Sequence, residues 1–266
     1  MHPLIRVAAA LVAALSALAA SAADGPFRAG TALVEITPPP TTSPAEIVGG
    51  FLPVPVRGVH DPLHARCLVL DDGTTRLALV VCDLLGIHRS VSDEARARIA
   101  KRVGIPPEAV LVSATHTHSA TSALGDRLAG GGPLDAYQEF VAERIAEGVA
   151  RAVEALAPAE AGWGSIEAPE HLSNRRWYLR PGTMPPNPFG AIDMVKMNPA
   201  PGSPDLVEPA GPTDPTLTFL AVRGPDGGLR ALLGTYGLHY VGGIGAGEIS
   251  ADYFAEFAGE RARRTA

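Results

Sequence analysis

Two short apolar runs with a helical stretch between them constrain the fold of this chain more than any other feature. Residues 77–81 (LALVV) and 109–112 (AVLV) are continuous apolar runs, which are typical of strands buried in a sheet. Between them, Ser90 followed by Asp93 predicts a capping box at the start of a helix, and Gly104 predicts its end. Strand, helix, strand is the repeating unit of α/β proteins, so the sequence predicts that class.

Two hairpins extend this unit. Residues 65–70 and 77–81 flank the turn sequence DDGT, which favours a β-hairpin. The sequence around Asp226-Gly227-Gly228 predicts a second hairpin, whose final strand, residues 229–238, ends at His239. A histidine is thus expected at the end of a strand.

Two more helices follow from the spacing of apolar residues. Residues 135–156 have apolar side chains at helical intervals, which predicts an amphipathic helix packed on the sheet. Residues 253–264 predict a similar helix. The expected fold class is therefore α/β, a mixed β-sheet flanked by helices, with a metal site at the carboxyl ends of strands.

The first 23 residues have the pattern of a secretory signal peptide. Arg6 precedes a run of Ala, Leu and Val, and small residues at positions 20–23 suit a cleavage site. The apolar run is about 14 residues long, shorter than the roughly 20 needed to cross a bilayer. We expect a secreted or periplasmic protein in which residues 24–266 form one α/β domain; an uncleaved anchor is the alternative.

The composition argues against nucleic acid as a partner, and the positions of the two cysteines predict their redox state. A hydrophobic fraction of 46% is ample for a core, and a net charge of -6 gives no basic field for nucleic acid. Cys67 and Cys82 lie on the two strands of the first hairpin, where pairing around the turn places them diagonally. Two separate buried thiols are expected, with a disulfide as the alternative.

A turn with two histidines directly follows the strand at residues 109–112. His116 and His118 lie in the sequence SATHTHS, and ligands in open α/β sheets gather at the carboxyl ends of strands. Neutral imidazole is a good zinc ligand, so this pair is a candidate metal site. Two solvated loop histidines are the alternative, and a metal site needs a further ligand distant in the sequence.

Four segments in order resemble the amino-terminal part of the neutral ceramidase family. They are GVHDPLHARCLVLDDG at 58–73, SATHTHS at 113–119, SNRR at 173–176, and the stretch from GLHYV at 237 to ISAD at 252. The resemblance runs from about Arg28 to the end of the chain. Enzymes of this family hydrolyse the amide of ceramide with one zinc ion, which two histidines, a glutamate and a tyrosine bind.

The resemblance implies roles for four residues. His116 and His239 match the family's zinc-binding histidines, His118 matches a catalytic histidine beside the metal, and Arg175 matches an arginine near the substrate. The family's glutamate and tyrosine ligands lie later in its chain, and nothing here matches them. This sequence also has Tyr240 where the family has a proline after the histidine, which leaves the lipid specificity open.

The residues themselves offer oxygen ligands that could complete a site. Asp61, Asp83, Glu248 and Asp252 are the candidates for a third protein ligand. The pair His60-Asp61 is either support for such a site or an ordinary turn before proline.

These observations lead to one expected function and two alternatives. We expect an exported, zinc-dependent hydrolase of an N-acyl amide, acting on a small-molecule or lipid substrate with peripheral membrane contact. The first alternative is a zinc hydrolase of another class, such as a phosphoester or lactam hydrolase. The second is a secreted binding module or an inactive fragment, because two family ligands are missing. The sequence predicts no oligomeric state.

Overall fold

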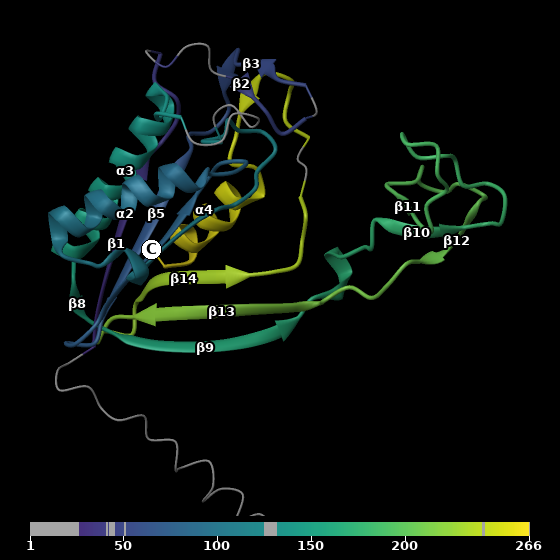
Figure 1. Cartoon of the computed structure of the whole chain (residues 1–266). Coiled ribbons are helices and arrows are strands. Elements are labelled where there is room, and N and C mark those ends of the chain that lie inside the picture. Colours follow the sequence, from purple (N-terminus) through teal and green to yellow (C-terminus); the bar gives the residue numbers. More distant parts are fainter. Residues whose placement is uncertain are drawn as a thin grey trace, which may run out of the picture. The chain divides into compact units, whose positions relative to one another are not determined.

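The computed structural model describes residues 27–265 except 41, 43–45, 51, 125–131 and 241–242 (Figure 1). The predicted signal peptide lies outside the described residues. The chain divides into two compact units. The first comprises the chain up to Glu160 with Val222–Ala231 and Val241–Ala266, and the second comprises Ala161–Ala221 and Leu232–Tyr240.

A five-stranded mixed sheet is the centre of the first unit. Its strands, in the order β7-β6-β5-β1-β8, are β7 (Val110–Ala114), β6 (Arg76–Cys82), β5 (His64–Asp71), β1 (Arg28–Glu35) and β8 (Ala157–Pro158). β6 and β7 run parallel, and the other neighbours are antiparallel. The predicted hairpin and the predicted strand, helix, strand unit are both confirmed, as is the α/β class.

Helix α2 (Arg89–Val103) connects the two parallel strands. Gly104 ends it in the left-handed conformation, as the sequence predicts. The predicted capping box at Ser90 and Asp93 is wrong: His88 is the N-cap, and its Nδ1 accepts a hydrogen bond from the backbone N–H of Ser90 at 3.3 Å. Ser90 already lies in the first turn, where its own N–H needs an acceptor.

Helix α3 (Ala136–Glu154) packs on the sheet. Asp135 caps it, and Gln138 completes a capping box. The helix lies so close to β1 that a Cβ on Gly30 would come within 2.0 Å of the carbonyl oxygen of Ala152. Glycine at position 30 therefore permits the closest approach of helix and sheet.

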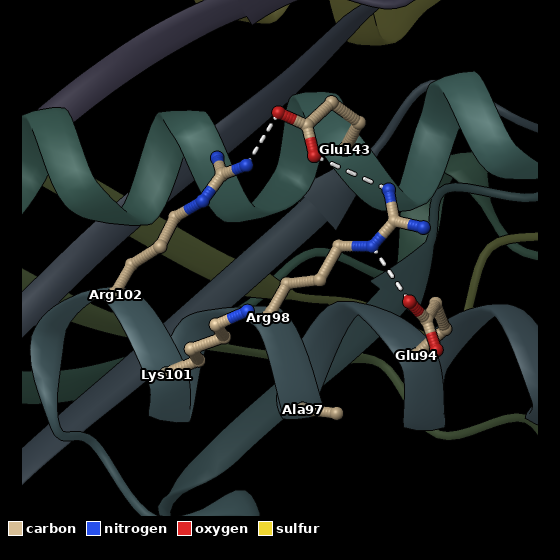
Figure 2. Close-up of a pocket in the computed structure, with 6 residues that line it drawn as sticks. All are labelled: Glu94, Ala97, Arg98, Lys101, Arg102 and Glu143. Atoms are coloured by element: carbon tan, nitrogen blue, oxygen red, sulfur yellow. Dashed lines mark hydrogen bonds and ion pairs between the residues drawn. The ribbon is translucent and has the colours of Figure 1, made fainter.

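Charged residues join α2 to α3 in a surface groove (Figure 2). Arg98 donates to Glu94 at 2.7 Å and to Glu143 at 3.2 Å, and it also pairs with Glu139. Arg102 donates to the other oxygen of Glu143 at 2.5 Å. Exposed pairs of this kind contribute about 0–1 kcal/mol each. Because each acidic group in the groove has an arginine partner, the network supports helix packing.

The two cysteines are separate, buried thiols, as expected. Cys67 lies opposite Val80 and Cys82 lies opposite Ala65, so the two are diagonal across the β5–β6 ladder. Burial raises the pKa of Cys67 to about 12 and raises that of Cys82 well above its ordinary value.

Several short elements and a third helix complete the first unit. β2 (Glu46–Ile47) pairs antiparallel with β3 (Val54–Pro55), and β4 (Gly58–Val59) pairs parallel with β15 (Glu248–Ile249). The 3₁₀ helix η1 (Pro107–Ala109) leads into β7. Helix α4 (Tyr253–Thr265), which the sequence predicts, follows β15.

The remaining elements form two three-stranded sheets. One has the order β11-β10-β12, from β11 (Lys196–Met197), β10 (Arg176–Leu179) and β12 (Leu206–Pro209), and follows η2 (Pro169–His171). The other has the order β14-β13-β9, from β14 (Leu229–Thr235), β13 (Thr216–Arg223) and β9 (Glu160–Glu167). β14 ends at Thr235 and not at residue 238, because Gly237 weakens strand pairing beyond that point.

No helix among the described residues combines the length and the apolar character that crossing a bilayer requires.

Candidate metal centre

The turn at residues 115–119 continues from the carboxyl end of β7. The backbone N–H of Thr115 donates to the Cys82 carbonyl at 2.9 Å, and that of His116 donates to the Leu84 carbonyl at 3.0 Å. His116 has a φ of 64°, a left-handed conformation that costs a non-glycine residue about 1–2 kcal/mol. The hydrogen bonds to the chain after β6 maintain this conformation at the sheet edge.

A hydrogen bond determines the tautomer of His116. Its Nδ1 lies 2.8 Å from the carbonyl oxygen of Leu85. Because a carbonyl oxygen can only accept, Nδ1 carries a proton, and in the neutral imidazole the lone pair is then on Nε2. Metal-binding histidines usually have their other ring nitrogen fixed in this way.

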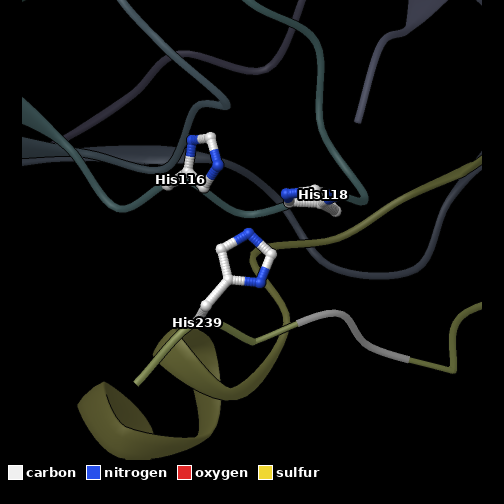
Figure 3. A group of neighbouring side chains, drawn as sticks. All are labelled: His116, His118 and His239. Atoms are coloured by element: carbon white, nitrogen blue, oxygen red, sulfur yellow. The ribbon is translucent and has the colours of Figure 1, made fainter. Parts of the chain in front are cut away.

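His116, His118 and His239 are grouped (Figure 3). The rings of His116 and His118 are nearly perpendicular, at 83°, with centroids 4.9 Å apart. One ring nitrogen from each of the three histidines lies within 4.8 Å of the others, and such a group could hold a metal ion. The sequence predicts His239 at the end of a strand, but β14 ends four residues earlier, at Thr235. That prediction is wrong.

Asp83, a predicted candidate ligand, has other partners. Its carboxylate accepts hydrogen bonds from Arg66 at 2.5 Å and from the backbone N–H of His64 at 3.0 Å. Burial raises the pKa of this fully buried carboxyl, although Arg66 opposes the shift. Asp83 therefore supports the start of β5 and lies outside the histidine group found among the described residues.

Asp61 and Glu248 are engaged elsewhere too. Asp61 accepts hydrogen bonds from His60, from the Ser250 hydroxyl at 2.5 Å and from the Ala251 N–H at 2.9 Å. Burial acts to raise the pKa of Asp61, but these hydrogen bonds outweigh it and hold the pKa below its ordinary value. The carboxylate of Glu248 lies over Gly58, where a Cβ would come within 2.5 Å of it. The pair His60-Asp61 is thus part of a connection between β4 and the segment after β15.

Asp252 contacts the histidine turn directly. Its carboxylate accepts hydrogen bonds from the hydroxyls of Thr117 and Ser119, the two residues that flank His118. None of the four predicted oxygen ligands joins the histidine group in the described part of the chain. The four candidates have other partners: Asp61, Asp83 and Asp252 accept hydrogen bonds, and Glu248 packs on Gly58.

Arg175 lies immediately before β10 with an exposed side chain. Its backbone carbonyl accepts a hydrogen bond from Asn198 at 2.8 Å. Its role in substrate binding stays a prediction.

Gly49 supports the turn and is not evident as a functional residue in the sequence. The N–H of Val48 donates to the Ala120 carbonyl at 3.3 Å, and Gly49 lies against the backbone of His118. The sequence alone gives no signal for this contact, because it joins segments far apart in the chain.

Comparison with known proteins relates this fold to ceramidases. No family model matches the sequence, and no curated protein matches it. The structure of neutral ceramidase from Pseudomonas aeruginosa is similar with a TM-score of 0.58 and 21% identity, over 86% of this chain and 34% of that one. A ceramidase complexed with C2 is similar with a TM-score of 0.56 and 23% identity over the same shares. This chain thus spans about a third of those proteins, and it has the fold of part of a neutral ceramidase.

Proposed function

We propose that this chain is the amino-terminal part of a zinc-dependent hydrolase that cleaves an N-acyl amide bond, as found in ceramide. The observation that carries the proposal is the group of His116, His118 and His239, whose ring nitrogens lie within 4.8 Å of one another. The fold shared with ceramidases over 86% of the chain agrees with it.

The donor set fits zinc. Imidazole nitrogens bind this ion at about 2.0–2.1 Å, and catalytic zinc sites use three protein ligands and keep one position open. The hydrogen bond from Nδ1 of His116 to the Leu85 carbonyl fixes the orientation of the ring, as is usual for metal-binding histidines. We assign His116 and His239 as two of these three ligands.

Amide hydrolysis needs a nucleophile at neutral pH and stabilisation of negative charge on the carbonyl oxygen. A zinc ion, when bound, supplies Lewis acidity that polarises a carbonyl and lowers the pKa of a bound water to about 7. His118, whose ring centroid lies 4.9 Å from that of His116, would accept a proton from the attacking water and return it to the leaving amine. Arg175 would bind a polar group of the substrate through its planar guanidinium.

The test compares substrates and metal states. We expect release of fatty acid from an N-acyl sphingoid substrate, loss of that activity on chelation, and recovery when zinc is added. A phosphoester substrate is assayed in parallel. Cleavage of the phosphoester alone would support the alternative of another zinc hydrolase. A chain that binds no zinc would contradict the proposal and support a binding module.

We also propose export, directed by residues 1–23. N-terminal sequencing of the protein from the secreted or periplasmic fraction should begin near Asp24. A retained Met1 would contradict this.

A further inference from the structure

We propose that Asp252 is a positioning residue that holds the turn of His116 and His118 in its metal-binding shape. The inference rests on the proposed function and adds to it a residue outside the histidine group. Asp252 touches neither imidazole through its carboxylate hydrogen bonds, so it acts through Thr117 and Ser119.

Both oxygens of the Asp252 carboxylate accept hydrogen bonds from the turn. The Thr117 hydroxyl donates to Oδ2 at 2.6 Å, and the Ser119 hydroxyl donates to Oδ1 at 2.9 Å. Thr117 is fully buried and Asp252 is 7% exposed, so water does not substitute easily for either partner. Hydrogen bonds to a charged acceptor are about twice as strong as neutral ones. One carboxylate therefore fixes the residues on both sides of His118.

Asp252 is itself held rigidly. It has a left-handed φ of 53°, and its N–H donates to the Ser250 hydroxyl at 2.9 Å. The N–H of Ser250 donates to the Ser119 carbonyl at 2.8 Å. The Ser250 hydroxyl in turn donates to Asp61 at 2.5 Å. The segment that carries Asp252 is thus anchored to the turn through its backbone and to the end of β4 through Asp61.

The hydroxyls of Thr117 and Ser119 each need an acceptor. The carboxylate of Asp252 offers one oxygen to each of them. Asparagine has nearly the same shape and tolerates the left-handed conformation, but its amide nitrogen cannot accept a hydrogen bond. Asp252→Asn therefore removes one of the two contacts while disturbing the backbone little. Losing a supporting partner of a metal ligand typically weakens metal binding by about 10–100-fold.

The experiment measures zinc affinity by competition with a chromophoric chelator, and the visible spectrum of the cobalt-loaded chain, alongside thermal unfolding. We expect Asp252→Asn to remain folded, to bind zinc at least about 10-fold more weakly, and to show an altered cobalt spectrum. Thr117→Val, which removes the hydroxyl and keeps the shape, should reproduce the effect. Thr117→Ser should restore wild-type affinity.

A matched control separates positioning from general stability. Asp71 is another buried carboxylate, 2% exposed, which Arg28 and Arg76 hold at the far end of β5. Asp71→Asn should lower the unfolding midpoint and leave zinc affinity unchanged. An equal loss of zinc affinity in Asp71→Asn would overturn the inference.

The remaining outcomes separate this inference from the proposed function. If the wild type binds zinc and Asp252→Asn binds it equally well, the positioning role is wrong and the proposed function stands. If Asp252→Asn loses zinc but neither Thr117→Val nor Ser119→Ala does, Asp252 does not act through the turn, and the inference is overturned. If the wild type binds no zinc, the proposed function and the positioning role of Asp252 are both wrong.

Discussion

The backbone of His118 lies directly against Gly49, where a Cβ would come within 2.1 Å of the His118 carbonyl oxygen and 2.4 Å of its Cα. The turn thus has a support on this side that is separate from Asp252. Backbone atoms cannot move aside as the end of a flexible side chain can. A methyl group at position 49 must therefore displace the segment that carries His118.

Gly49→Ala should destabilise the fold by about 1–3 kcal/mol, the usual range for overpacking, and weaken zinc binding. Gly50→Ala is the control, because a Cβ there would meet its nearest neighbour, the Leu52 carbonyl oxygen, at an ordinary 3.5 Å. Urea unfolding and a zinc titration check both variants. Equal behaviour of the two would mean that the turn tolerates displacement.

His118→Ala should separate metal binding from catalysis. Because we assign the ligands as His116 and His239, this variant should keep its zinc and lose amide hydrolysis by about 100-fold or more, the usual contribution of a general acid or base. Metal analysis and the rate of fatty acid release provide the two measurements. Loss of zinc together with activity would make His118 a third ligand.

The two thiols should be inert in the native protein. Because burial raises the pKa of Cys67 to about 12, only about one part in ten thousand is thiolate at pH 8. Cys82 is fully buried and should react no faster. A thiol reagent should therefore modify neither residue before unfolding and both after addition of denaturant, with or without reductant. A reductant-dependent reaction after unfolding would reveal a disulfide.

Asp71 should make stability depend on acidic pH. Burial acts to raise its pKa, but hydrogen bonds and charge from Arg76, Gly73 and Arg28 outweigh this, so the folded pKa lies below the ordinary value. The carboxylate therefore stabilises the fold above the unfolded pKa of about 3.9, and the contribution is lost as the pH falls through the folded value. At pH 7, Asp71→Asn should lower the free energy of unfolding by about 2 kcal/mol.

Urea unfolding of wild type and Asp71→Asn at a series of pH values checks this. The difference between them should shrink as the pH falls below about 4. A difference that stays constant to pH 3 would show that the Asp71 charge is not responsible.

Local patterns were sufficient to predict the elements that bring the histidine turn to the sheet edge. The β5–β6 hairpin, helix α2 ending at Gly104, and the parallel strand β7 each follow from a short stretch of apolar spacing and turn residues. The start of α2 could not be predicted in this way. Its N-cap is the imidazole of His88, and standard capping patterns do not include histidine.

Supports of the site come from contacts between distant segments, for which a single sequence has no signal. Asp252 and Thr117 are 135 residues apart, and Ser250 and Asp61 are 189 apart. The sequence marked Asp252 and Asp61 as candidate ligands from their residue type, but only the hydrogen-bond partners show that they act as supports. Only the family resemblance identified His239 as a candidate ligand, because a single histidine after a strand is usually structural.

The central claim is that His116 and His239 bind one zinc ion together, and elemental analysis with a zinc affinity titration tests it most directly. The wild-type chain should hold one zinc per molecule, and both His116→Ala and His239→Ala should lose it while remaining folded. His171, which lies in η2 and has an exposed side chain, provides a control substitution that should leave zinc unchanged. Full zinc content in either His116→Ala or His239→Ala would contradict the account.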